Sequence, residues 1–269
     1  MSSEAVFLTR RGGFVATELA RGPWDPDAQH GGAPAALLMR EFERLPAADG
    51  LMIARVTYEL LRPVPLGELD VAAEVIRPGR RVQLLEASIR TPDGTEVLRA
   101  RALQVQRADT PEYTHDPRPA EGPDQGQELP PPFPRPKSPT FGPDAIEVRV
   151  VRGSWGGGPA TAWFRLKVPV VAGENPTPLQ ALAAAGDFGN GISRVLPWDD
   201  YLFINPDLTL YIERPPVGEW ICLDAETRIS ADGVGLAESV VYDTRGRVGR
   251  ALQALLIARR SANPAPAGS

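Results

Sequence analysis

Residues 32–45 read Gly-Ala-Pro-Ala-Ala-Leu-Leu-Met-Arg-Glu-Phe-Glu-Arg-Leu, and this stretch decides the fold that the sequence predicts. Alanine and leucine favour a helix, and Pro34 lies near its start, where the missing N–H costs nothing. Several faces of this helix carry almost no charge. Because a helix that is apolar nearly all round must be buried, the sequence predicts a buried helix over Gly32–Leu45.

A second segment of the same kind lies in the other half of the chain. Residues 177–188 read Thr-Pro-Leu-Gln-Ala-Leu-Ala-Ala-Ala-Gly-Asp-Phe. Thr177 has the residue type of an N-cap, and Pro178 suits the first helical position. The sequence therefore predicts a second buried helix over Thr177–Phe188.

Several residues recur at a constant offset of 152 positions, namely Arg62-Pro63 with Arg214-Pro215, Glu86 with Glu238, Gly94 with Gly246, and Arg107 with Arg259. Alternating apolar residues predict a run of strands in each half. The expected strands are Leu51–Leu61, Leu66–Ile76, Val82–Arg90 and Val97–Gln106, then Leu208–Glu213, Glu219–Ile229, Leu236–Tyr242 and Val248–Ala258. Hairpin-type turns between them favour antiparallel pairing. We therefore expect an α+β chain of two tandem repeats, each with a central helix wrapped by an antiparallel sheet.

Proline divides the two repeats. The chain has 29 prolines, and eleven of them lie from Pro111 to Pro143. Such a stretch fits neither a helix nor a central strand, because proline lacks the N–H and has a fixed φ. The expected organisation is an N-terminal repeat at 1–107, a proline-rich linker at 108–143, a C-terminal repeat at 144–260 and a disordered tail at 261–269.

Composition narrows the function classes. The formal net charge of −5 weighs against a partner that is nucleic acid or an anionic membrane. Cys222 is the single cysteine, and with His30 and His115 it is too little for a disulfide framework or a typical zinc site. No apolar run reaches the length of a membrane helix, and the first residues lack the pattern of a signal peptide. We therefore expect a cytoplasmic protein.

Three short motifs lie at different places in the two repeats. Gln29-His30-Gly31-Gly32 opens the first helix, Ala185-Gly186-Asp187-Phe188 closes the second, and Ala251–Leu255 forms part of the final strand. In this order the motifs resemble those of the TesB-like acyl-CoA thioesterases, whose fold is the double hotdog. The resemblance implies an acyl-CoA hydrolase that activates water by a general base, with no metal and no bound cofactor. It also implies a homo-oligomer with acyl-CoA as its substrate.

Thioester hydrolysis requires an activated water and a stabilised oxyanion. His30-Gly31-Gly32 begins a helix whose unpaired N–H groups and positive dipole end suit the thioester oxygen. Met39 stands where similar single-hotdog thioesterases carry an acid, and the second helix carries the acid Asp187 without a His-Gly-Gly motif. We expect one composite site, with Gly31 and Gly32 from the first half and Asp187 from the second.

The resemblance also suggests the roles of the remaining residues. Asp187 is the expected general base or water-orienting carboxylate, and Gly31 and Gly32 polarise the carbonyl. Gln253 falls on the glutamine of the family, and Asn205 stands at the position that usually holds threonine. We expect Asn205 and Gln253 to hold the water, and we expect His30 to contribute only partly to activity. The tryptophans are expected in the core or the acyl pocket, at positions 24, 155, 163, 198 and 220.

Two other functions remain open from the sequence. Asp25 lies five residues before His30, a spacing that resembles the signature of a double-hotdog enoyl-CoA hydratase or dehydratase. The Asn-Pro part of that signature is replaced by Asp27-Ala28. The second alternative is a non-catalytic acyl-CoA-binding protein, because Asn205 departs from the thioesterase pattern. The acyl chain, and the choice between CoA and carrier-protein esters, also remain open.

Overall fold

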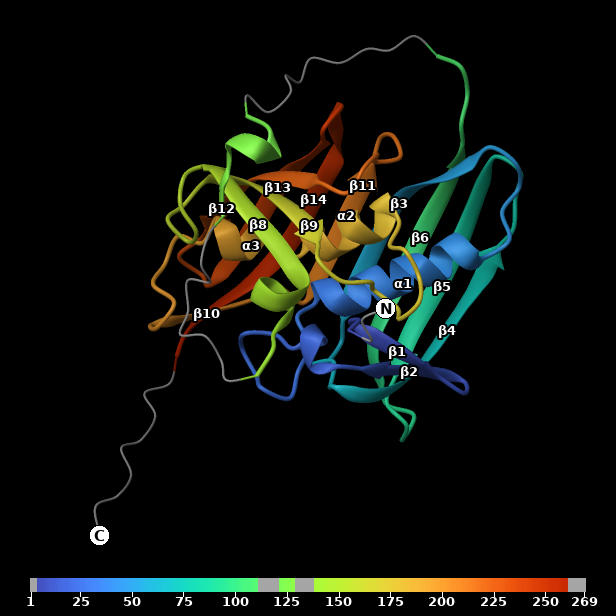
Figure 1. The fold of residues 1–269 in the computed structure, drawn as a ribbon, viewed down its shortest axis with the longest axis horizontal. Coiled ribbons are helices and arrows are strands. Elements are labelled where there is room, and N and C mark those ends of the chain that lie inside the picture. Colours follow the sequence, from blue (N-terminus) through green and yellow to red (C-terminus); the bar gives the residue numbers. More distant parts are fainter. Residues whose placement is uncertain (1–3, 111–120, 129–137, 261–269) are drawn as a thin grey trace.

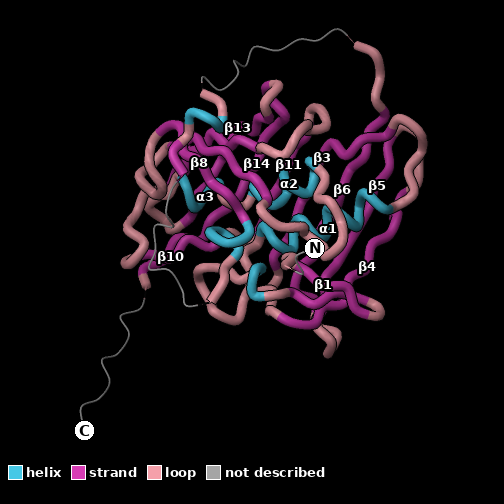
Figure 2. The backbone as a smooth tube through the Cα atoms, in the orientation of Figure 1, coloured by secondary structure: helices cyan, strands magenta, loops and turns pink. Residues whose placement is uncertain are grey.

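The computed structural model describes residues 4–110, 121–128 and 138–260 (Figure 1). The tail predicted at 261–269 lies outside these residues, as do residues 111–120 and 129–137 of the predicted linker. Strands are the commonest regular element of the described chain, and the helices lie between them (Figure 2).

Both predicted helices are present. Helix α1 spans Gly32–Arg44 and α2 spans Pro178–Gly186. Thr177 is the N-cap of α2, and its hydroxyl accepts the backbone N–H of Gln180 at 3.2 Å. An N-cap hydroxyl satisfies a helix N–H that has no partner within the helix. The sequence signals at the start of α2 therefore act as predicted.

The predicted end of the second helix at Phe188 is wrong by two residues. Asp187 is the C-cap of α2, and its N–H bonds back to the carbonyl of Ala185. After this cap the chain turns and forms the short helix α3 at Gly189–Ile192.

The predicted strands are present to within about two residues at each end. The described strands of the first half are β1 (Phe7–Arg10), β2 (Gly13–Ala16), β3 (Leu51–Leu60), β4 (Gly67–Arg77), β5 (Val82–Arg90) and β6 (Glu96–Gln106). Those of the second half are β7 (Gln127–Glu128), β8 (Ile146–Arg152), β9 (Ala160–Leu166), β10 (Tyr201–Ile204), β11 (Asp207–Ile212), β12 (Ile221–Ile229), β13 (Val234–Asp243) and β14 (Gly246–Arg259).

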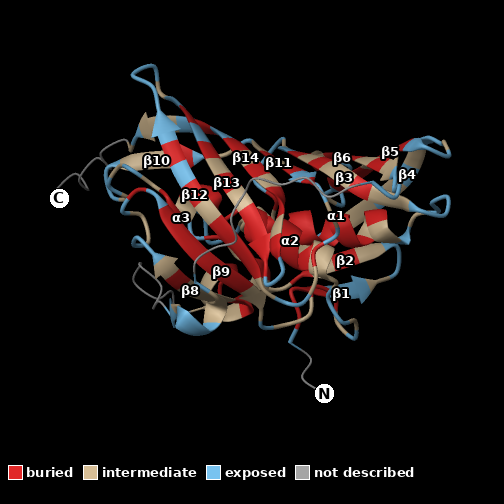
Figure 3. Cartoon of the chain, turned by 90° about the horizontal axis from the view of Figure 1, so that it is seen from above, coloured by how far each residue is buried: buried red, intermediate tan, exposed pale blue. Residues whose placement is uncertain are grey.

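One sheet joins both halves. Its strand order is β1-β2-β4-β5-β6-β3-β11-β14-β13-β12-β9-β8-β7, and β10 pairs with β14 beside this path. Neighbouring strands run antiparallel, as predicted. The sheet curves around α1 and α2, whose buried surfaces lie within the curve (Figure 3). Helix α1 is buried from Gly32 to Arg40, which confirms the prediction from its apolar faces.

The two halves meet at a pair of equivalent strands. β3 lies beside β11 with Thr57 opposite Thr209, and their hydroxyl oxygens are 3.2 Å apart. These threonines are 152 residues apart, which is the offset at which the sequence repeats. An antiparallel pair centred on equivalent residues has a local twofold axis. One hydrophobic core extends through both halves.

The described part of the proline-rich linker is more than a spacer. It contains the 3-10 turn η2 (Pro123–Gln125) and the strand β7, which pairs with β8. The π-helical turn η3 (Phe141–Ala145) follows it. Phe141 is fully buried, and its N–H donates to the carbonyl of Arg21 at 2.8 Å. An apolar anchor among the prolines therefore ties this segment to the first half.

Candidate active site

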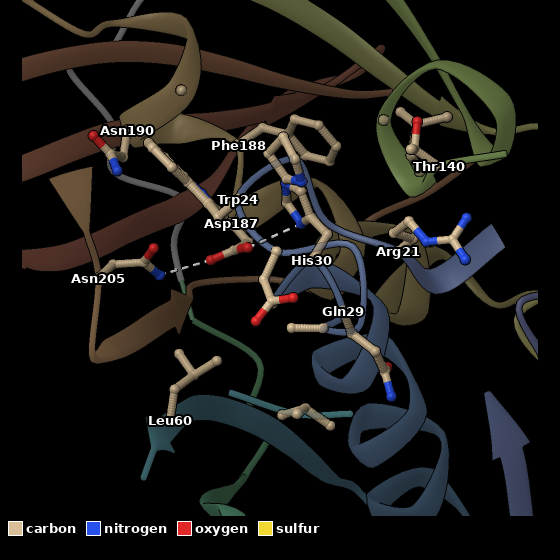
Figure 4. Close-up of a pocket in the computed structure, with 18 of the residues that line it drawn as sticks. Arg21, Trp24, Gln29, His30, Leu60, Thr140, Asp187, Phe188, Asn190 and Asn205 are labelled. Carbon is tan, nitrogen blue, oxygen red and sulfur yellow. Dashed lines mark hydrogen bonds and ion pairs between the residues drawn. The ribbon is translucent and has the colours of Figure 1, made fainter. Parts of the chain in front are cut away.

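A cavity of about 1090 Å³ lies where the two halves meet (Figure 4). The first half contributes the loop before α1 and the end of β3. The second half contributes the start of α3, the turn after β10 and the segment at η3. The lining includes Trp24, His30, Asp187, Phe188 and Asn205. Residues far apart in the sequence therefore share one space.

The Asp187 carboxylate lies on the wall of this cavity and is only 9% exposed. Its Oδ1 accepts hydrogen bonds from Asn205 Nδ2 at 2.7 Å and from Gln253 Nε2 at 3.1 Å. Its Oδ2 lies 3.0 Å from His30 Nδ1 (Figure 4). A buried carboxylate requires such partners, because it has lost its hydration. The three side chains therefore fix both oxygens of Asp187.

Glycine at the start of α1 allows the close approach of α2. A Cβ atom on Gly31 would lie 2.8 Å from Oδ2 of Asp187, and one on Gly32 would lie 2.4 Å from the carbonyl oxygen of Ala184. Both distances are too short for a side chain. The N-terminus of α1 and the carboxylate at the end of α2 are therefore in direct contact, as expected for the composite site.

His30 has two partners at one nitrogen. Its Nδ1 lies 3.1 Å from the backbone N–H of Gly32 and 3.0 Å from Oδ2 of Asp187. A protonated Nδ1 donates to Asp187, and an unprotonated Nδ1 accepts from Gly32. The N–H of Gly32 is therefore released whenever Nδ1 carries a proton. The ring stacks on Phe188 with a centroid distance of 4.3 Å, which holds it in place.

Gln253 is bound to the protein through all of its amide groups. Its Nε2 lies 3.1 Å from Oδ1 and 3.3 Å from the carbonyl oxygen of Asp187, and its Oε1 accepts the N–H of Asn190 at 3.0 Å. The side chain is 1% exposed. The amide of Gln253 is therefore bound to Asp187 and α3, and the expectation that it also holds the water stays a prediction.

Asn205 lies in the turn between β10 and β11 and lines the cavity. Its Nδ2 donates to Asp187 and also to the carbonyl oxygen of Asp207 at 3.2 Å. Among the described residues no donor binds its side-chain oxygen, which remains an acceptor at the cavity wall. The neighbouring Asp207 has its pKa raised by burial, although the N–H of Ala254 partly offsets this.

Asp25, the other acid considered for His30, is placed differently. Its carboxylate accepts the backbone N–H of Asp27 at 2.9 Å within an exposed turn. His30 is paired with Asp187 instead. The structure therefore does not form the Asp25–His30 pair that the hydratase alternative requires.

Two aromatic residues that the sequence did not single out as site residues lie around His30. Phe141 and Phe188 flank the imidazole of His30 at centroid distances of 5.3 and 4.3 Å. Three of the tryptophans expected in the core or the acyl pocket line this cavity, at positions 24, 155 and 198. Phe188 could have been suspected from the sequence because it directly follows Asp187. Phe141 could not, because it lies in a proline-rich segment that predicts a linker.

The described residues contain neither a metal-binding cluster nor a membrane-spanning helix. In that part of the chain, no group of three or more His, Cys, Asp or Glu side chains lies close enough to bind a metal ion. None of the described helices has the length and hydropathy that crossing a membrane requires.

Comparison with protein families identifies two matching models. Residues 20–105 match the model described as the acyl-CoA thioesterase N-terminal domain. Residues 114–257 match the model described as the acyl-CoA thioesterase C-terminal domain. No match was found among curated proteins.

Solved structures share the fold at low sequence identity. A protein with a hot dog fold from Alicyclobacillus acidocaldarius has a TM-score of 0.71 at 18% identity, covering 95% of this chain and 96% of that one. The acyl-CoA thioesterase II TesB2 from Mycobacterium marinum has a TM-score of 0.63 at 16% identity, covering 95% of each chain. The tesB protein of Mycobacterium avium subspecies paratuberculosis has 0.59 at 15%, covering 93% and 94%. The chain therefore has a hotdog fold.

Proposed function

The chain belongs to the acyl-CoA thioesterase family, and on this premise we propose that it hydrolyses acyl-CoA to a free acid and CoA. One observation carries the proposal. The Asp187 carboxylate lies on a cavity wall, against the N-terminus of α1 and held by two amides and an imidazole. A base beside the N–H groups of a helix N-terminus is what hydrolysis of a thioester requires.

Asp187 acts as the general base in this proposal. A carboxylate offers about four lone-pair positions to hydrogen-bond donors. Asn205, Gln253 and His30 occupy three of them. The remaining position accepts a proton of the attacking water, and the side-chain oxygen of Asn205 accepts the other. In this proposal Gln253 is a positioning residue, because its amide N–H groups donate to the carbonyl and carboxylate oxygens of Asp187.

The N-terminus of α1 stabilises the oxyanion. Water attacks the thioester carbonyl as its proton passes to Asp187, and negative charge develops on the carbonyl oxygen. The amide N–H groups of Gly31 and Gly32 and the positive end of the helix dipole stabilise that charge. The tetrahedral intermediate then collapses, the C–S bond breaks, and the proton held by Asp187 goes to the leaving sulfur. The products are the acid and the CoA thiol.

His30 links the base to the oxyanion site. When its Nδ1 donates to Asp187, it fixes the carboxylate and leaves the N–H of Gly32 for the substrate. His30→Ala removes the hydrogen bond from the imidazole to Asp187 but keeps the carboxylate base, so we expect activity to fall without disappearing. The hydratase alternative is not supported, because Asp25 binds a backbone N–H in its own turn.

The fold underlying this site is proposed to be two tandem hotdog units, each with its own central helix. The strand pair centred on Thr57 and Thr209 supports a duplicated unit. In such a pair, each helix N-terminus meets the other helix, which explains why one site draws residues from both halves. Sedimentation velocity tests the homo-oligomer that the sequence predicts.

A thiol-release assay tests the proposed function. The wild type and Asp187→Asn are assayed against acyl-CoA esters of different chain length and branching. We expect wild-type turnover of at least one ester and a loss of about a thousandfold in kcat for the variant, since general-base catalysis contributes roughly 10²–10⁴-fold. Asparagine keeps the shape of the side chain, and circular dichroism checks the fold. Turnover that survives in Asp187→Asn, or a wild type that cleaves no ester, contradicts the proposal.

A further inference from the structure

Two tryptophans, one from each half, form a stacked pair at the cavity. The indole rings of Trp24 and Trp198 are 3.8 Å apart with an interplanar angle of 25°, and both residues line the cavity that holds Asp187. Figure 4 shows Trp24 among the side chains around Asp187. Trp24 is 43% exposed. A large aromatic surface therefore faces outward at the cavity that holds the proposed base.

Two arginines pack against this pair. The guanidinium of Arg260 lies 5.4 Å from the ring of Trp24 and 5.3 Å from that of Trp198, and Arg194 lies 5.3 Å from Trp198. Arg260 Nε donates to the carbonyl of Trp198 at 2.9 Å, which anchors the guanidinium over the rings. The cluster of Trp24, Trp198, Arg194 and Arg260 is called the aromatic platform below.

The arginines of the platform lack carboxylate partners. In the part of the chain that the structure describes, neither Arg194 nor Arg260 has a carboxylate within ion-pairing distance. Burial lowers the pKa of Arg194, although the charge of Asp199 partly offsets this. Among the described residues, Arg194 Nε has no hydrogen-bond partner. A partly buried guanidinium without an anion is costly. The platform therefore has positive charge available for an anionic ligand.

Another cluster of one tryptophan and two arginines, around Trp220, differs from the aromatic platform in its charge pairing. Arg149 and Arg165 lie 4.9 and 4.8 Å from the ring of Trp220, which is outside the cavity lining. These arginines pair with Glu147, at 2.7 Å for Arg149. The charges of that cluster are thus neutralised within the protein. The platform differs from it in two respects. Its arginines have no carboxylate partner among the described residues, and its two tryptophans line the cavity.

We propose that the aromatic platform binds the nucleotide end of CoA, with the adenine stacked on the exposed face of Trp24 and the phosphates near Arg194 and Arg260. This inference rests on the proposed function and deepens it, because it selects CoA over a carrier protein as the thiol carrier. Stacking on tryptophan holds any purine ring. Arginine is suited to phosphate, and Arg62, which also lines the cavity, adds a third cation.

Binding of adenosine 3′,5′-bisphosphate tests the platform without any hydrolysis. Isothermal titration compares the wild type with Trp24→Leu and Arg260→Gln. The matched controls are Trp220→Leu and Arg165→Gln, which alter the neutralised cluster. We expect saturable binding to the wild type, weakened at least tenfold by both platform variants and less than twofold by both controls. Absence of binding to the wild type, or equal effects in both clusters, overturns the proposal.

A kinetic comparison tests the same contact during turnover. The kcat/KM for an acyl-CoA is divided by that for the same acyl group on N-acetylcysteamine, which lacks the nucleotide. We expect Trp24→Leu and Arg260→Gln to lower this ratio at least tenfold, mainly through the KM of the CoA ester. An unchanged ratio, or a higher kcat/KM for the same acyl group on a carrier protein than on CoA, overturns the proposal.

The two proposals fail in different ways. If the wild type binds adenosine 3′,5′-bisphosphate through the platform but cleaves no thioester, the proposed hydrolysis is wrong and the nucleotide site stands. If thioesters are cleaved but the platform variants bind the nucleotide as well as the controls do, the nucleotide site is wrong and hydrolysis stands. Asp187→Asn is expected to keep nucleotide binding while losing turnover.

Discussion

Each of the two central helices meets a carboxylate of the other helix at its N-terminus. At α1, Gly31 contacts Asp187 from the end of α2. At α2, Glu43 from α1 accepts the hydroxyl of Thr177 at 2.8 Å and Nε2 of Gln180 at 3.0 Å. Both arrangements place an acid against a helix N-terminus, where negative charge is favoured. The duplicated fold therefore presents one pattern twice.

The carboxylates of Asp187 and Glu43 differ in the cavity and in the helix start beside them. The cavity beside Asp187 has a volume of about 1090 Å³, whereas the one beside Glu43 has about 320 Å³. Glycine opens the start of α1, whereas Pro178, which has no N–H, and Leu179 begin α2. Under the proposed function, a carboxylate at a helix N-terminus is therefore not enough for a hydrolytic site. Open space and free amide N–H groups for a substrate carbonyl are also required.

Among substitutions that leave Asp187 itself in place, Gly31→Val should have the largest effect on activity. A Cβ there would lie 2.8 Å from Oδ2 of Asp187, so the carboxylate must move. A displacement of about 1 Å in a catalytic group can cost roughly a hundredfold in rate. We expect Gly31→Val to lower kcat/KM in the thiol-release assay by about that factor. Leu179→Val at the start of α2 is the matched control. A loss in this variant as large as that in Gly31→Val would contradict the proposed difference between the two helix N-termini.

Gln253→Leu should have the next largest effect. It removes two hydrogen bonds to Asp187 and leaves the N–H of Asn190 without its partner. A hydrogen bond to a charged group contributes about 1.5–3 kcal/mol, which corresponds to roughly ten- to hundredfold in rate. We expect this loss in kcat rather than in KM. Gln180→Leu, which removes the amide at Glu43, should change kcat less than twofold; an equal loss argues against a single site.

Asn205→Ala should lower kcat by roughly tenfold, because Asp187 loses one of two amide donors and the water loses an acceptor. Asn205→Thr sharpens the comparison with the family pattern, since a hydroxyl replaces the amide. We expect the threonine variant to be more active than the alanine variant. Equal kcat values for alanine, threonine and wild type would show that Asn205 does not support the base.

Glu43→Gln should have the smallest effect on activity and a measurable effect on stability. Burial raises the pKa of Glu43 above its ordinary value of 4.5, although bonds from Gln180 and Thr177 oppose this. The folded state therefore holds the proton more tightly, and its stability falls as pH rises from 4.5 through the raised pKa. We expect the neutral variant to reduce this fall in chemical denaturation between pH 4 and pH 8. A wild type whose stability rises through this range because of Glu43 contradicts the account.

Sequence reasoning predicted the regular elements well because their signals are local. Alternation and turn residues mark strands such as β5, and Thr177-Pro178 marks a helix start. The contact of Asp187 with Gly31 was expected, because the motifs place the glycine helix start in the first half and the acid in the second. The partners of Gln253 were not, since a glutamine in a strand gives no sign of which atoms its amide meets.

Some side-chain contacts could not be predicted, because they join residues that are far apart in the sequence. Phe141 enters the core from a proline-rich stretch whose composition suggests a plain linker. Trp24 and Trp198 meet only because two loops from different halves converge at the cavity. Glu43 reads as an ordinary helical acid until α2 lies against it. These positions follow from tertiary packing, which overrides composition.

The most direct test of the central claim is a side-by-side measurement of kcat for Asp187→Asn and Glu43→Gln on the same acyl-CoA ester. The account predicts a loss of about a thousandfold for Asp187→Asn, because the general base is removed, and a change below twofold for Glu43→Gln. Comparable losses in both variants, or substantial turnover by Asp187→Asn, would contradict a single composite site at the N-terminus of α1.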